Sequence, residues 1–261
     1  MSANGNNHLG VNLAYTTFLF VTPAADDDTA RTRMRAVGGN VSRGFFNDFE
    51  AEGGRETTTH ETIQFLVNEE GREQKGLAGA RYAMQVCSKY RPRLQDTEAE
   101  LRRRLCGNAE IVAIDGAVRV PQYTSAEMHA YAYRHAIARQ SGRLQRSVII
   151  IPMSKTEEWW AKSPLDRHAY FYPHAENGTR VHGHARAAEA GIATIHRKLY
   201  YNPEGTGRAG EFDFITYFEC ADEHLPTFDN ICRALRDQRQ NPEWRYVIEG
   251  PEWRGKRVLK W

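Results

Sequence analysis

Residues 192–219 read IATIHRKLYYNPEGTGRAGEFDFITYFE, and this stretch decides the fold. It contains two runs rich in β-branched and aromatic residues, 192–201 and 211–219. A turn with three glycines, 202–210, separates them. Such a pattern predicts two antiparallel strands joined by a hairpin connection.

The segments around this hairpin complete a domain. The helix that follows it is the clearest element, because apolar residues recur there at helical spacing. These residues are Leu225, Phe228, Ile231, Cys232 and Leu235. The sequence also predicts a strand at 147–152, helices at 156–171 and 184–190, an inserted loop at 172–183, and one or two strands within 244–260. The order strand, helix, strand, strand, helix, strand is typical of a ferredoxin-like domain.

The N-terminal half has a weaker version of the same order. We expect strands at 11–22, 62–67 and 109–120, a helix starting near 26–28, and a helix at 97–105. Thr97 and Glu100 have the spacing of a capping box at the start of that helix. The predicted fold is therefore α+β, with two tandem ferredoxin-like domains, each an antiparallel sheet with helices on one face. The predicted boundaries are 1–125 for the N-terminal domain, 126–146 for a connector and 147–261 for the C-terminal domain.

Composition is that of an ordinary globular protein. The 261 residues are 41% hydrophobic and 26% charged, and the net charge is +2. This balance favours neither a nucleic-acid nor a membrane partner. The N-terminus lacks the pattern of a signal peptide, and the four cysteines form no CxxC pair, so we expect a cytoplasmic protein with reduced thiols.

The predicted hairpin places an arginine among apolar residues. Alternate residues of a strand face the same side, so Arg197 shares a face with Ile195 and Leu199. A buried guanidinium is costly unless it meets an anion or a paired acceptor. The alternative is that Arg197 lies at the strand edge or pairs with Glu219 or Asp213, and spacing alone leaves both possibilities open.

Histidines gather in the C-terminal half. They are His168, His174, His182, His184 and His196. Neutral imidazole is a good ligand for iron or zinc. The spacing matches no metalloprotease or zinc-finger signature, so on spacing alone each histidine is better explained by solvation or a structural role than as a metal ligand.

Two long strings resemble the chlorite dismutase family. They are IPMSKTEEWWAKSP (151–164) and HRKLYYNPEGTGRAGEFDFITYFE (196–219), and the match spans about 147–250. A weaker match is NAEIVAIDGAVRVPQYT (108–124). The resemblance implies two ferredoxin-like domains per subunit, a homo-oligomer that is usually a pentamer, and haem b in the C-terminal domain, with coproheme the less favoured cofactor. The N-terminal domain would hold no cofactor.

The resemblance also implies roles for individual residues. His184 would bind the iron, because it lies 13 residues before Arg197, which matches the arginine above the iron. His174 is the alternative ligand if the extra residues of 172–183 follow the ligand instead. Gln240 aligns where the family has a glutamate bonded to the ligand imidazole, so we expect less electron donation to iron. Other positions match residues that line the haem or its distal pocket: Trp159, Trp160, Leu199, Thr216, Phe218, Tyr123 and Thr124.

The implied activity is conversion of chlorite to chloride and dioxygen at a histidine-ligated iron with a distal arginine. The substrate would be a small anion or a peroxide. Alternatives are a haem peroxidase and a haem-binding accessory or sensor protein without turnover. Coproheme decarboxylation is less favoured, since that branch commonly has tyrosine where this chain has Trp160. An interaction protein without cofactor would require the pocket residues to be accidental.

Overall fold

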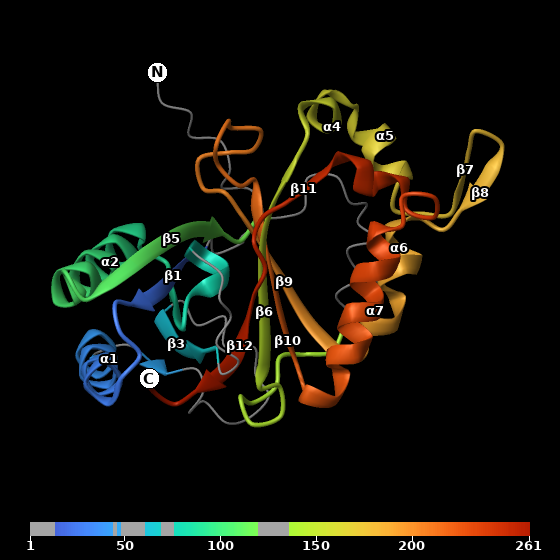
Figure 1. Cartoon of the computed structure of the whole chain (residues 1–261). Helices are drawn as coiled ribbons and strands as arrows, with labels where there is room; N and C mark the ends of the chain where they lie inside the picture. Colours follow the sequence, from blue (N-terminus) through green and yellow to red (C-terminus); the bar gives the residue numbers. More distant parts are fainter. Residues whose placement is uncertain (1–13, 44–45, 48–60, 69–75, 120–135) are drawn as a thin grey trace, which may run out of the picture.

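The strands of both halves join into one closed barrel, with helices on two opposite outer walls (Figure 1). The computed structural model describes residues 14–43, 46–47, 61–68, 76–119 and 136–261. The sheet runs in the order β10-β9-β5-β1-β4-β3-β12-β6-β11, and pairing of β10 with β6 closes the ring. The strand bounds are β1 Tyr15–Pro23, β3 Glu61–Val67, β4 Tyr82–Ser88, β5 Ala109–Ala117, β6 Ser147–Lys155, β9 Ile195–Tyr201, β10 Phe214–Cys220, β11 Val247–Glu249 and β12 Trp253–Val258, while β2 Phe46–Asn47 pairs with β3.

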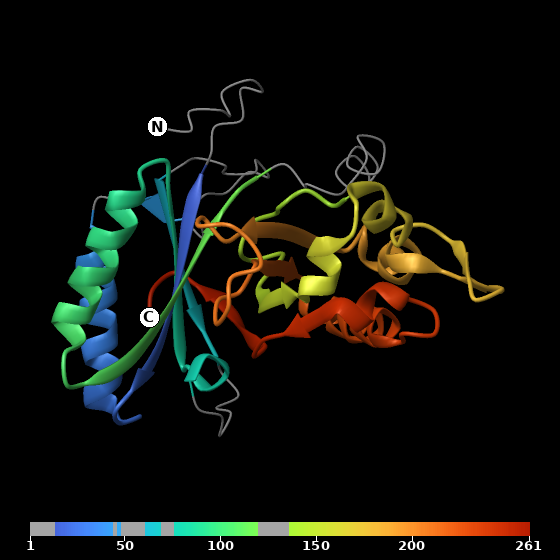
Figure 2. The same ribbon diagram turned by 90° about the horizontal axis from the view of Figure 1, so that it is seen from above.

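The N-terminal half is a ferredoxin-like unit in which antiparallel strands β5, β1, β4 and β3 are neighbours. Helices α1 (Asp28–Val41) and α2 (Arg91–Leu105) lie on its outer face (Figure 2). The side chain of Asp27 caps α1 by accepting from Ala30 N at 2.7 Å. The capping box predicted at Thr97 is wrong, because α2 begins six residues earlier. Thr97 lies inside the helix, where its Oγ1 donates to Arg93 O at 2.7 Å.

The C-terminal half repeats the arrangement with strands β9, β10, β6 and β12 and the outer helix α7 (Leu225–Arg236). The predicted helix at 156–171 is divided into α4 (Glu157–Ala161) and α5 (Pro164–Ala169). Pro164 ends the first helix, and Ser163 caps the second. Two short helical segments, α6 (Gly183–Ala188) and η2 (Glu189–Gly191), lead into β9.

The inserted segment is not an irregular loop. It holds a hairpin of β7 (His174–Glu176) and β8 (Thr179–Val181) that projects from the body of the protein (Figures 1 and 2). Asn177 and Gly178 form its turn, both with positive φ (49° and 75°). An Asn-Gly pair is the preferred sequence for such a two-residue turn.

Alternating side chains divide the core between the barrel interior and the helix-covered faces. On β1, Phe18 and Phe20 pack inside the barrel with residues of both halves. Leu19 and Val21 face the other way, toward α1 and α2. A further apolar cluster lies between the outer face of β6, β9 and β10 and the helix α7.

A buried polar network also joins the halves. Glu219 on β10 accepts from Arg139 Nη2 at 2.7 Å and pairs with Arg257 at 3.4 Å. Gln64 on β3 bonds Tyr217 and Arg139 in the same network. The α+β prediction of two ferredoxin-like units is therefore confirmed, and the two units share one interior. Within the ranges above, no helix is both long and apolar enough to cross a membrane.

Candidate functional site

The imidazole of His184 is bound on one side by a buried carboxylate. Its Nδ1 lies 2.9 Å from Glu243 Oε2. The His184 side chain is 21% exposed, whereas that of Glu243 is 3% exposed. With a carboxylate as partner, Nδ1 carries the proton and donates. In the neutral imidazole the lone pair then lies on Nε2, and among the described residues Nε2 has no hydrogen-bond partner. This is the arrangement of a histidine that binds a metal through Nε2.

Glu243 is also paired with a buried lysine. Its Oε1 accepts from Lys155 Nζ, and the Lys155 side chain is 3% exposed. Burial opposes ionisation of Glu243, but the positive Lys155 and the hydrogen bond from His184 outweigh it and lower the pKa to about 2. Burial lowers the pKa of Lys155, and Glu243 opposes that shift. The site therefore contains an ionised carboxylate directly behind the imidazole.

This geometry overturns the prediction for Gln240. The residue beside the imidazole is Glu243, three positions further along, in the helical turn η4 (Pro242–Tyr246). Gln240 contributes its backbone carbonyl instead, which accepts from the N–H groups of His182 and Gly183 at 3.0 Å each. The segment after α7 thus supports His184 twice, through a carboxylate and through a main-chain oxygen.

A glycine makes the approach of the His184 backbone possible. Gly183 has φ of +74°, and a Cβ at this position would lie 2.5 Å from the carbonyl oxygen of Tyr172. The next two N–H groups donate to preceding carbonyls, His184 to Tyr170 at 3.1 Å and Ala185 to Phe171 at 3.0 Å. Sequence reasoning missed Gly183 and Glu243, although a glycine directly before the candidate ligand was a signal for a close backbone contact.

The two tryptophans have different environments. Trp159 is fully buried, and its ring centroid lies 5.6 Å from those of both Tyr170 and Tyr246. The ammonium of Lys155 lies 4.2 Å from the Trp159 ring centroid. Trp160 is only half-buried, and its Nε1 donates to Asp213 Oδ2 at 2.9 Å. Trp159 belongs to the core behind the His184 site, whereas Trp160 keeps part of its ring exposed.

Four predicted pocket residues share the outer face of the hairpin. Arg197 pairs across the strands with Phe218, and Leu199 pairs with Thr216. Leu199 and Phe218 are half-buried and pack against the apolar cluster under α7. Arg197 is exposed and forms no hydrogen bond or ion pair with any described residue. Its face is the one that α7 covers, and α6, which holds His184, packs beside α7 (Figure 1).

The structure excludes the two acidic partners considered for Arg197. Glu219 is fully buried and bonds Arg139 and Arg257. Asp213 is 2% exposed and bonds Trp160. The guanidinium of Arg197 is therefore available to a small anion on an otherwise apolar surface.

Among the described residues, no carboxylate is bonded to the alternative ligand His174. It lies at the start of β7, where its Nδ1 is 2.9 Å from Tyr172 O. Within the part of the chain that the structure describes, no three His, Cys, Asp or Glu side chains are grouped as a metal site. Tyr123 and Thr124 lie outside the described residues.

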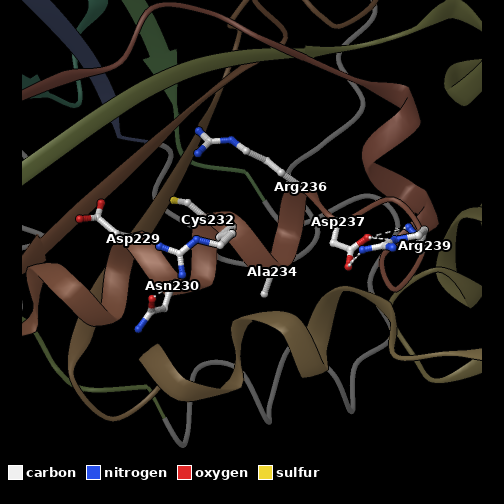
Figure 3. A pocket seen from close by; sticks show the side chains of 8 residues that line it. Asp229, Asn230, Cys232, Ala234, Arg236, Asp237 and Arg239 are labelled. Atoms are coloured by element: carbon white, nitrogen blue, oxygen red, sulfur yellow. Dashed lines mark hydrogen bonds and ion pairs between the residues drawn. The ribbon is translucent and has the colours of Figure 1, made fainter.

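Figure 3 shows a pocket along α7 and the turn after it, and none of the predicted site residues lines it. Its lining residues are Asp229, Asn230, Cys232, Arg233, Ala234, Arg236, Asp237 and Arg239. Arg236 is engaged by Glu249 at 2.6 Å, and Arg239 by Asp237 at 3.1 Å. Burial raises the pKa of the Cys232 thiol to about 11, so the thiol is unreactive at neutral pH.

No family model matches the sequence. The structure is similar to that of chlorite dismutase from Candidatus Nitrospira defluvii in complex with imidazole, at 21% identity and a TM-score of 0.65, over 94% of this chain and 91% of that chain. A variant of the same enzyme in complex with cyanide matches at 20% identity and a TM-score of 0.64, over 94% and 90%. The chain therefore has the chlorite dismutase fold, as its two sequence strings indicated.

Proposed function

We propose that this protein is a haem-dependent oxidoreductase of the chlorite dismutase type, which converts chlorite into chloride and dioxygen. The observation that carries the proposal is the hydrogen bond of His184 to the ionised Glu243, which leaves Nε2 available for iron. The fold match adds a scaffold on which this activity is known.

The residues present fit a haem b. His184 would bind the iron through Nε2. The half-buried Trp160, Leu199, Thr216 and Phe218 would contact the porphyrin, because a large flat apolar group needs such a wall. When bound, haem supplies an iron that coordinates a small oxidant and exchanges oxygen and electrons with it.

The reaction balances without a second substrate. Chlorite contains one chlorine and two oxygens, which leave as chloride and dioxygen. Chlorine gains the four electrons that the two oxygens lose, so no external reductant is required. The protein must hold a small anion near the iron, and Arg197 is the residue for that role. A guanidinium stays charged at any working pH and binds oxyanions through charge-assisted hydrogen bonds.

Glu243 restores the electron donation that a glutamine would have weakened. A carboxylate bonded to a ligand imidazole increases the basicity of that ligand. Lys155 keeps the carboxylate ionised by lowering its pKa. This arrangement favours an oxidoreductase over a haem-binding accessory protein without turnover.

A haem peroxidase is the second candidate, and the same hydrogen bond supports it, because electron donation from the ligand side also favours cleavage of a peroxide. Arg197, with no partner among the described residues, favours an anionic substrate instead. We therefore place chlorite first.

The deciding experiment is oxygen evolution after chlorite is added to haem-loaded protein in a sealed oxygen electrode. We expect fast evolution approaching one dioxygen per chlorite, and none from a His184→Ala variant. Absence of oxygen from protein that holds haem would overturn the chlorite proposal. Oxidation of a dye by hydrogen peroxide in the same sample would then favour the peroxidase.

A further inference from the structure

Three hydrogen-bond donors from separate parts of the chain converge on the carboxylate of Asp213. The residue is 2% exposed. Its Oδ2 accepts from the backbone N–H of Lys155 at 2.8 Å and from Trp160 Nε1 at 2.9 Å. Its Oδ1 accepts from the backbone N–H of Gly207. One side chain thus joins the end of β6, the indole of Trp160 and the connection between β9 and β10.

The same contacts fix the ring of Trp160. Gly207 has φ of +74°, and a Cβ there would lie 3.4 Å from Cδ1 of Trp160, in ordinary van der Waals contact, so the connection passes beside the indole. The guanidinium carbon of Arg167 lies 5.5 Å from the ring centroid. The half-buried indole is therefore restrained at its N–H by Asp213 and at its ring by Gly207 and Arg167.

The three N–H groups at Asp213 require a side chain that accepts hydrogen bonds and donates none. An ionised carboxylate has about four lone-pair sites and no hydrogen to donate, so it can satisfy all three N–H groups. An amide of the same shape has one oxygen and an NH₂ group. In an Asp213→Asn variant the single oxygen can keep the two donors that share Oδ2, Lys155 and Trp160, whereas Asp213→Ala has no acceptor and loses all three contacts.

We infer that Asp213 is the positioning residue that holds the Trp160 indole in the orientation needed to contact haem. Through the N–H of Lys155, whose ammonium binds Glu243, it also fixes the segment that supports His184. The inference rests on the proposed haem function. Asp213 touches no reacting atom in this role and acts through Trp160 and Lys155.

The first test uses the protein without haem and follows the indole N–H of Trp160 by ¹H–¹⁵N NMR. A Trp160→Phe variant assigns the signal by its absence. A hydrogen bond to a charged group corresponds to roughly tenfold to hundredfold in an equilibrium constant, so Asp213→Ala, which removes both oxygens, should speed exchange of this proton by at least about tenfold. Glu211→Ala is the matched control, since Glu211 is an exposed carboxylate in the same connection. Unchanged exchange in Asp213→Ala would overturn the inference.

The second test is a haem titration of four proteins: wild type, Asp213→Ala, Trp160→Phe and the double variant. We expect each single variant to bind haem about tenfold more weakly, and the double variant to lose no more than either single one, because both changes remove the same contact. Additive losses, or unchanged affinity in Asp213→Ala, would overturn the inference while the proposed function stands. Failure of the wild type to bind haem would instead overturn the proposed function, and with it the haem part of the inference. The NMR experiment would still decide whether Asp213 holds Trp160.

Discussion

Replacing Glu243 with glutamine is the sharpest test of the buried charges at the site. The carboxylate and the Lys155 ammonium are each 3% exposed, so neither is hydrated enough to tolerate the loss of its partner. Removing one partner of a buried ion pair costs about 3–5 kcal/mol. The amide oxygen retains one acceptor, which it can offer to Lys155 or to His184 but not to both. We therefore expect a loss near the lower end, about 3 kcal/mol in the free energy of unfolding.

The assay is urea and thermal unfolding of the haem-free protein, followed by circular dichroism. For a chain of this size, about 3 kcal/mol corresponds to a fall of roughly 6–12 °C in Tm. Glu249→Gln is the matched control, because Glu249 pairs with Arg236 at the surface and its side chain is 26% exposed. Such pairs contribute about 1 kcal/mol or less. If Glu243→Gln unfolds within 1 kcal/mol of both the wild type and this control, the argument from buried charge is refuted.

Three other substitutions test separate parts of the structure. Arg197→Ala should keep haem but lower chlorite turnover, measured as oxygen evolution, by about 10²-fold, because the anion loses its guanidinium partner; undiminished turnover removes Arg197 from its role. Burial opposes ionisation of Glu219, but two arginines outweigh it and lower the pKa of Glu219 to about 2. The charged carboxylate therefore stabilises the fold above its ordinary pKa of 4.5, and this contribution is lost as pH falls toward 2. Glu219→Gln should therefore flatten the decline of unfolding free energy between pH 5 and 2 measured in urea, and a slope equal to that of the wild type would contradict this. Gly183→Ala should destabilise the protein by several kcal/mol in thermal melts, because backbone strain at positive φ, about 1–2 kcal/mol, adds to the clash with Tyr172 O. Gly178→Ala is the control: Gly178 has φ of +75° and open space around its Cβ position, so this variant should show the strain alone.

Local patterns in the sequence predicted the helices and hairpins that are formed by contacts between residues close together in the chain. The hairpin of β9 and β10 has both of its strands and its turn in one stretch, and α7 has its apolar face at helical spacing. The start of α2 was misplaced because the Thr97 hydroxyl can bond a carbonyl inside a helix as well as an N–H at its start. Local spacing alone does not distinguish these two uses.

The closed barrel and the carboxylate behind His184 depend on contacts between distant segments. The seam between the halves pairs β3 with β12, about 190 positions apart, and a strand pattern does not name its partner. Glu243 reaches His184 across 59 positions, after a helix and a turn whose length fixes which residue faces the imidazole. The family resemblance predicts Gln240 at this place, three residues before Glu243, and therefore an amide where the structure has a carboxylate.

The hairpin of β7 and β8 lengthens the stretch between Trp160 and His184 without displacing the imidazole from Glu243. The chain leaves the body near Tyr172 and returns at Gly183, where the Cβ position lies against Tyr172 O. The backbone bonds from His184 to Tyr170 and from Ala185 to Phe171 close this gap. The added residues therefore form a projecting hairpin, and backbone hydrogen bonds hold the two segments that flank it side by side. A ligand placed after the hairpin keeps its position beside Glu243, whereas a ligand inside the hairpin would not. This geometry supports His184 over His174 as the residue that would bind iron.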